Sequence, residues 1–151
     1  QRAMHLVVDV TGYHPAGSSF VGVTPGRVLE SRSGLSTVDG EQNGVGRRRA
    51  GQVTEIQVAG RAGVPGDASA VVLNLAAVQP QLAGFVTAFP CGEARPTAST
   101  LNYAAGQVIA NGATIKVGVG GKVCVFTQRA MHLVVDVTGY HPANATTAKL
   151  V

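Results

Sequence analysis

The chain has 151 residues, of which 45% are hydrophobic and 13% charged, and its net charge is +4. One core can be buried in a chain of this length, and no stretch reaches the roughly 18 apolar residues of a membrane-spanning helix. The dense basic cluster, three arginines at 47–49, has no aromatic neighbours, so nucleic-acid binding is not predicted. Twenty glycines and seven prolines between short apolar runs are typical of an all-β domain.

The first sixteen residues occur twice. Residues 1–16 and 128–143 both read QRAMHLVVDVTGYHPA, at an offset of 127 residues (128 − 1 = 127). Because this offset is the size of one domain, we interpret the chain as a slice of a tandem array. Residues 1–16 would be the closing strand of a preceding repeat, 17–143 one complete repeat, and 144–151 a linker or cloning remnant.

The duplicated segment contains the first predicted strand, residues 4–10. Side chains of a strand alternate between its two faces. One face would carry Met4, Leu6, Val8 and Val10, and the other would carry His5, Val7 and Asp9.

Short strands are predicted next at 20–23 and 27–30, separated by a turn at Thr24-Pro25-Gly26. Residues 31–49 are polar and rich in glycine, and we predict a long surface loop, with or without a small hairpin at Asn43-Gly44. Residues 53–58 alternate between apolar and polar side chains and are predicted to form another strand.

The remaining predicted strands are 70–78, 85–89, 99–103, 113–119, 122–126 and 131–137. Residues 70–78 are nearly all apolar, so both faces of that strand are expected to be covered. Gly120-Gly121 predicts a two-residue hairpin turn. About eight or nine short strands without helical periodicity predict a two-sheet β-sandwich that resembles a jelly roll.

The two cysteines, Cys91 and Cys124, lack the spacing of a zinc site. A disulfide between them would close a loop of 33 residues (124 − 91 = 33), worth about 3–4 kcal/mol by loop entropy. Such a bond is typical of an extracellular module, whereas two buried free thiols would indicate a cytosolic protein. We predict the disulfide.

Several segments together resemble a module that is common in secreted actinobacterial proteins. They are FVGVTPGRVLESR (20–32), VPGDASAVVLNLAAVQP (64–80), GFVTAFPCG (84–92), PTASTLNYAAGQVIAN (96–111), GGKVCVF (120–126) and HLVVDVTGYHP (132–142). That module opens with P-x-R-L-L-D-T-R and closes with D-V-x-G-Y-F. This chain departs from it at Glu30-Ser31 and at His14 and His141. The resemblance implies a secreted or cell-surface tandem β module without a catalytic motif.

No catalytic constellation is predicted. His132 and Asp136 share a strand face about 13 Å apart, too far to touch, and a G-x-S-x-G elbow is missing. We interpret both as structural polar residues that need hydrogen-bond partners where they are covered. Asp39, Glu41 and Asn43 alternate as oxygen ligands would, but they lack the spacing of a calcium loop, so they are only weak metal candidates. No cofactor is predicted.

Asn74 and Asn102 lie inside predicted strands, where a buried amide must be satisfied by hydrogen bonds. The plain interpretation is that each ties a neighbouring loop to the sheet. The alternative is an isopeptide crosslink from Lys116, which would need an acid such as Glu55 beside it.

Two functions remain open from the sequence. The first is a non-catalytic structural or adhesion module whose partners are neighbouring repeats. The alternative is a binding module for cell-wall or environmental polysaccharide, for which Tyr103 and Tyr140 are the candidate ligand contacts. The chain has no tryptophan, so the aromatic support for sugar binding is thin.

The duplicated strand also predicts self-association. One module has one place for this strand, and residues 4–10 would otherwise expose an apolar face and an unpaired backbone edge. We therefore expect Met4 to Val10 to pair with an open sheet edge or to enter another molecule.

Overall fold

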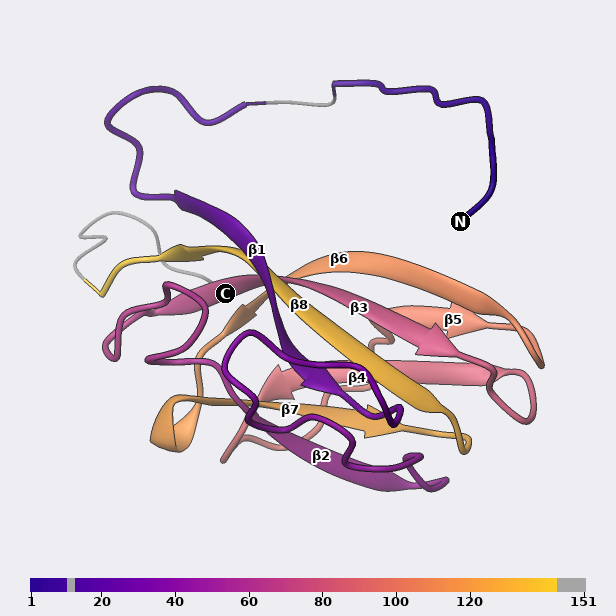
Figure 1. Cartoon of the computed structure of the whole chain (residues 1–151). Helices are drawn as coiled ribbons and strands as arrows, with labels where there is room; N and C mark the ends of the chain where they lie inside the picture. Colours follow the sequence, from indigo (N-terminus) through magenta and orange to yellow (C-terminus); the bar gives the residue numbers. More distant parts are fainter. Residues whose placement is uncertain (11–12, 144–151) are drawn as a thin grey trace.

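The computed structural model describes residues 1–10 and 13–143 and contains eight strands in two antiparallel sheets (Figure 1). The first sheet has the order β1-β8-β3-β6, formed by Val21–Glu30, His132–His141, Ala70–Val78 and Val108–Lys116. The second has the order β2-β7-β4-β5, formed by Gln52–Gln57, Lys122–Thr127, Gly84–Pro90 and Leu101–Tyr103. The predicted all-β two-sheet sandwich is confirmed.

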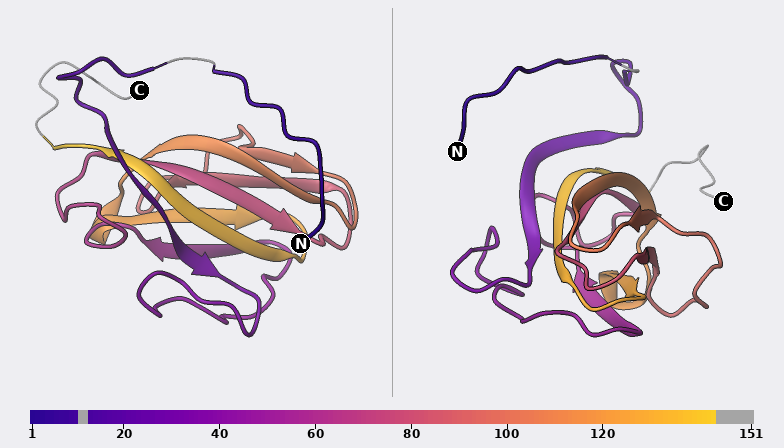
Figure 2. Two further views of the ribbon diagram at one scale, coloured as in Figure 1. Left: turned by 45° about the horizontal axis from the view of Figure 1, so that its top comes forward. Right: turned by 90° about the vertical axis from the view of Figure 1, so that its right-hand side faces the viewer.

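The strand order is that of a jelly roll, in which a long hairpin folds over into two sheets. β1 pairs with β8, β2 with β7, β3 with β6, and β4 with β5. The start of β1 therefore lies beside the end of β8, where Val21 is in register with Tyr140. Figure 2 shows the two layers from the side and end.

Apolar side chains from the inner faces of both sheets form the core. Strand β8 is central in its sheet, between β1 and β3. Its inward residues Leu133, Val135 and Val137 are fully buried, and so is Met131, which directly precedes the strand. Burial of a large aliphatic side chain is worth about 1.5–3 kcal/mol, so β8 contributes much of the stability of this sheet.

The first strand is longer than predicted. β1 runs through the expected turn at Thr24-Pro25-Gly26 as a bulged strand, with a register shift between Gly22 and Gly26. Proline cannot donate a ladder hydrogen bond, but it is tolerated on an edge strand and at bulges, and β1 is at an edge.

The hairpin predicted at Gly120-Gly121 is wrong. β6 and β7 belong to different sheets, and the short 3-10 turn Val119–Gly121 carries the chain from one sheet to the other. β6 also begins at Val108, five residues before the predicted start at 113 (113 − 108 = 5). The outward side chains of β3 are only half buried, so one of its faces is partly open.

The loop at 31–49 is long, as predicted, and Asn43 forms a bridge with Glu30 in place of a local hairpin. Arg61, only 6% exposed, holds this loop. Its guanidinium donates to both carboxylate oxygens of Asp39, at 2.7 and 2.8 Å, and to the carbonyl of Val28 at 3.0 Å. A buried charge needs partners of this kind, so the loop is fixed against the sandwich.

Residues 1–10 lie in neither sheet and run outside the sandwich (Figure 1). Met4, Leu6, Val8 and Val10 are between 77% and 88% exposed. Their counterparts in the trailing copy, Met131, Leu133, Val135 and Val137, are fully buried, so these positions have opposite environments in the two copies.

Candidate functional site

A cluster of charged side chains lies where β1 pairs with β8. Glu30 is fully buried and accepts hydrogen bonds of 2.9 Å from the guanidinium groups of Arg27 and Arg32. Arg27 also donates to Asp136 at 2.9 Å, because the two residues are in register across the strands. The hydrogen bonds from Arg32 hold the pKa of Glu30 below its ordinary value, and the bond to Asp136 raises the pKa of Arg27.

A serine–histidine pair lies beside this cluster. Ser31 Oγ is 2.9 Å from His132 Nδ1 and accepts the backbone N–H of Leu133, also at 2.9 Å. Burial, and then the charges of Arg47 and Arg32, lower the pKa of His132 and so favour the neutral ring. Ser31 is 1% exposed, so a substrate cannot reach its hydroxyl.

His132 and Asp136 thus have separate hydrogen-bond partners, and each of them connects β8 to another segment of the chain. The pair Ser31–His132 ties the start of the loop at 31–49 to β8, and the pair Arg27–Asp136 ties β1 to β8. Arg27, Glu30 and Arg61 were missed by sequence reasoning. The spacing of Arg27 and Glu30 within one strand gave no sign of their contact, because the bulge in β1 brings them together.

Cys91 and Cys124 form a disulfide with a Cα–Cα distance of 5.0 Å, as predicted. The bond joins the end of β4 to β7, whose ladder continues up to this point. Glu55 lies near the two sulfur atoms, but a disulfide offers no thiolate for a metal ion.

A groove of about 240 Å³ lies next to the disulfide, between β4, β6 and the segment 93–96. Phe89, Pro90 and Ile115 form its apolar part. Lys116 and Glu93 face each other there at 3.6 Å. Phe89 is only 7% exposed, and Arg95 lies 3.7 Å above the ring centroid of Phe126. The groove therefore has polar rims without an open aromatic platform.

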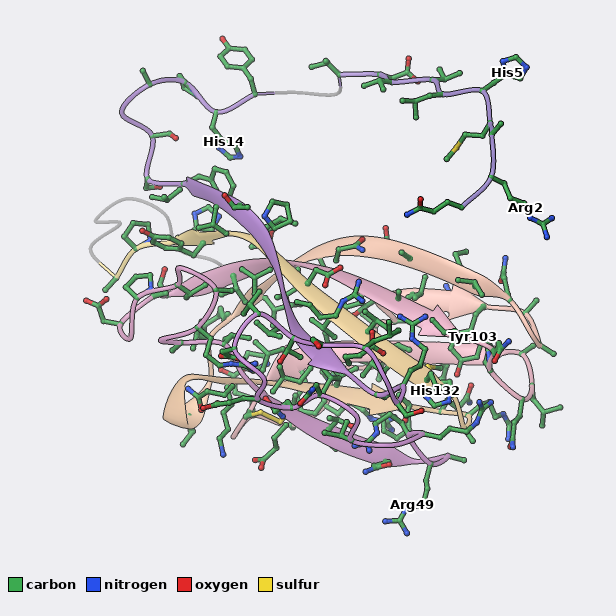
Figure 3. All side chains as sticks on the ribbon, viewed as in Figure 1. Arg2, His5, His14, Arg49, Tyr103 and His132 are labelled. Carbon is green, nitrogen blue, oxygen red and sulfur yellow. A yellow bond between two sulfur atoms is a disulfide. The ribbon has the colours of Figure 1, made fainter. Side chains whose placement is uncertain are left out.

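The two candidate tyrosines differ from the expectation. Tyr103 is 5% exposed, and its hydroxyl donates to the carbonyl of Phe85 at 3.3 Å and accepts the N–H of Arg129 at 3.3 Å (Figure 3). Burial raises the pKa of this hydroxyl. Tyr140 is half buried on β8 and packs against the core. The ring of Tyr103 therefore presents no open face, and that of Tyr140 is used in part for packing.

The two asparagines also differ from each other. Asn74 is half buried on the outer face of β3, in register with Asp136 of β8. Asn102 is exposed, contrary to the expected buried amide, because alternation on β5 turns Leu101 and Tyr103 inward. The isopeptide alternative fails on position: Lys116 is in register with Ala70, and Glu55 pairs with Lys122 at 3.8 Å.

Two of the three weak metal candidates, Asp39 and Glu41, are partners of Arg61. Both oxygens of Asp39 bind its guanidinium, whose hydrogen bonds hold the pKa of Asp39 well below its ordinary range. Glu41 is a more distant charge partner at 3.9 Å, and Asn43 forms the bridge to Glu30. This loop is therefore organised around an arginine that already supplies the positive charge.

The arginine cluster at 47–49 is also mostly structural. Arg47 donates to the carbonyl of Gln79, and the backbone of Arg48 pairs with that of Met131. Arg49 points away from the sandwich (Figure 3).

No protein-family model, no curated protein and no solved structure matches this chain. Within residues 1–10 and 13–143, no helix is long and apolar enough to span a membrane.

Proposed function

We propose that the chain is a non-catalytic structural or adhesion module of a repetitive secreted or cell-surface protein. The observation that carries this proposal is the identical copy of one strand, residues 1–16 and 128–143, at a spacing of one domain. A repeated module sets the length and spacing of a larger protein, and its partners are neighbouring repeats.

The use of the polar residues supports a role without catalysis. The hydrogen bond between Ser31 and His132 attaches the loop at 31–49 to β8, and the Ser31 hydroxyl is buried. The charges of Glu30, Asp39 and Arg61 are satisfied within the fold. A hydrolase would need a reachable nucleophile and a base beside it.

The disulfide supports a location outside the cell. Bonds of this kind persist in oxidising compartments and are rare in reducing ones. The resemblance to secreted actinobacterial modules agrees with this location.

The test is a screen of the whole chain against ester, glycoside and peptide substrates, together with a glycan array. We expect no turnover and no retained glycan, while the oxidised protein resists thermolysin. The proposal fails if turnover is found and is lost in His132→Ala with the fold intact.

Carbohydrate binding is the second candidate, because jelly rolls also serve as lectin domains and the groove beside the disulfide has polar rims. If this groove holds a sugar, Lys116→Ala should weaken binding to chitin oligosaccharides or peptidoglycan fragments. Lys122→Ala is the matched control, since Lys122 pairs with Glu55 outside the groove lining. Equal binding by both variants would exclude the groove as the sugar site.

A further inference from the structure

The place of β8 in the sheet has two candidate occupants in one chain. The trailing copy, residues 128–143, fills it with β8, while the described part of the leading copy, residues 1–10 and 13–16, lies outside the sheets (Figure 1). We propose that the leading copy is an interchangeable occupant, so that either copy can close the sheet between β1 and β3. This inference needs only the sequence and the sheet order, and it stands apart from the proposed function.

The duplication covers everything that β8 uses to bind. The strand itself is His132–His141, so the trailing copy adds four residues before it and two after it (132 − 128 = 4; 143 − 141 = 2). The duplicated segment includes the flanking Met131, whose backbone pairs with that of Arg48, as well as Leu133 in the strand, whose N–H donates to Ser31 Oγ. The leading copy has the same residue at every one of these positions. It can therefore make the same contacts.

The chain already contains the connection that this exchange needs. The end of β8 lies beside the start of β1, where Tyr140 is in register with Val21. Tyr13 corresponds to Tyr140 and precedes Val21 by only eight positions (21 − 13 = 8). Antiparallel neighbours are commonly joined by loops of about two to six residues, and the six residues 15–20, between the equivalent of His141 and the start of β1, are enough. The leading copy and β1 would then form a hairpin.

The connecting segment already contacts both copies at this end of the sheet. The ring of Phe20 stacks on His14 of the leading copy, with ring centroids 4.0 Å apart. The same ring lies 5.6 Å from that of His141 in the trailing copy. Gly139 makes room for it, because a Cβ there would lie 2.5 Å from the ring of Phe20. The leading copy is thus held by its end next to the end of the place that it would fill.

The two arrangements are closely matched in free energy. Each buries one copy and leaves the other exposed, and the buried contacts are the same in kind. They differ in the loop that joins the filling strand to its neighbour in the chain: four residues, 128–131, between β7 and β8, against the six residues 15–20 between the leading copy and β1. Loop-closure entropy makes this difference only about twofold in the equilibrium constant. The exchanged form is a circular permutation of the same fold, a change that domains with adjacent ends tolerate.

The test uses one buried position and its duplicate in the whole chain. Val135 is fully buried and in register with Leu29 of β1 and Leu75 of β3. Val135→Asp places a charge there and should expel the trailing copy. We expect this variant to stay folded as a monomer, with amide exchange protection lost at 132–141 and gained at 4–10. Val8→Asp is the matched control and should keep protection at 132–141.

The double variant Val8→Asp with Val135→Asp should unfold, because neither copy can then fill the place. If Val135→Asp alone unfolds like the double variant, the proposal is wrong. If it folds only as a dimer that dissociates on dilution, the exchange occurs between molecules and same-chain closure is overturned. Sedimentation across the micromolar range separates these outcomes, and the introduced Asp marks which copy each peptide comes from.

Discussion

The leading and trailing copies have the same sixteen residues, and the structure gives the apolar residues of 4–10 and of 131–137 opposite environments. Leu6 is 79% exposed and Leu133 is fully buried, and Val8 is 77% exposed where Val135 is fully buried. Hydrophobicity and β propensity cannot separate the copies, because they are identical. What differs is the connection: the trailing copy follows β7 by a short turn, and the leading copy precedes β1. Burial is therefore set here by which copy fills a single place in the sheet.

This comparison divides the core into residues that the chain carries twice and residues that it carries once. A residue of β8 has a duplicate that can replace it if the copies exchange. A residue of β3, or the disulfide, has no substitute in either arrangement. The effects of substitutions should follow this division more closely than they follow burial.

The largest effect is expected at Leu75, which is fully buried on β3 and in register with Val135. Leu75→Ala should lower the free energy of unfolding by about 3–5 kcal/mol, from lost burial and the cavity left behind. Leu133→Ala is the matched control, equally buried but duplicated by Leu6. Its cost should be under about 0.5 kcal/mol, since the leading copy can take over. If urea unfolding gives the same loss of free energy for Leu75→Ala and Leu133→Ala, residues carried once and residues carried twice do not differ in the way proposed.

The disulfide is the next largest effect. Replacing Cys91 and Cys124 by serine should cost about 3–4 kcal/mol, because the bond closes a loop of 33 residues in the unfolded chain. The bond joins the end of β4 to β7, so it should stabilise both arrangements alike. The cysteine replacements should therefore lower the free energy of unfolding by the same amount when they are added to Val8→Asp and when they are added to Val135→Asp. Unequal losses would mean that the exchanged form has a different core.

The sequence predicted the architecture well because the sheets follow simple rules. Apolar runs bounded by glycine and proline located most strands, and 70–78 matches β3 at both ends. It could not predict which turns cross between sheets. Gly120-Gly121 has the composition of a hairpin turn, but β7 finds its partners in β2 and β4, far away in the sequence. Such pairing is decided by the packing of the whole fold.

The polar residues were predicted less well. His132 and Asp136 were expected to need hydrogen-bond partners where they are covered, but the partners themselves, Ser31 and Arg27, are more than a hundred residues away in the chain. Tyr103 was expected as a ligand contact and is buried instead, because its hydroxyl finds two backbone partners at the edge of the core. Contacts between residues so far apart in the chain leave no pattern in the sequence around either residue.

A smaller effect is expected at Glu30, which the chain carries once. Glu30→Gln keeps the shape but removes the charge that binds Arg27 and Arg32, and it should cost about 2–3 kcal/mol, because these arginines are only partly exposed. Glu55→Gln is the control: Glu55 is exposed and its pair with Lys122 is long, so the change should stay within about 0.5 kcal/mol.

The same variant tests the acid side of the stability curve. Because the pKa of Glu30 is lowered in the folded chain, its contribution is present above the ordinary carboxylate pKa and is lost as the pH falls through the folded value. Unfolding of Glu30→Gln should therefore depend less on pH below about pH 4.5 than that of the parent chain. An unchanged slope would show that other carboxylates account for the acid sensitivity.

The smallest effect concerns the histidine that either copy can supply. The pKa of His132 is lowered from 6.5, so the unfolded chain binds a proton more readily than the folded one. Stability should therefore be highest above pH 6.5 and decrease as the pH falls through this value, then level off below the folded pKa. His132→Gln alone should leave this dependence in place, because His5 of the leading copy can occupy the same position beside Ser31. In the double variant His5→Gln with His132→Gln, the urea midpoint of unfolding should vary much less with pH between about pH 5 and pH 8. If the single variant already flattens them, only the trailing copy fills the sheet.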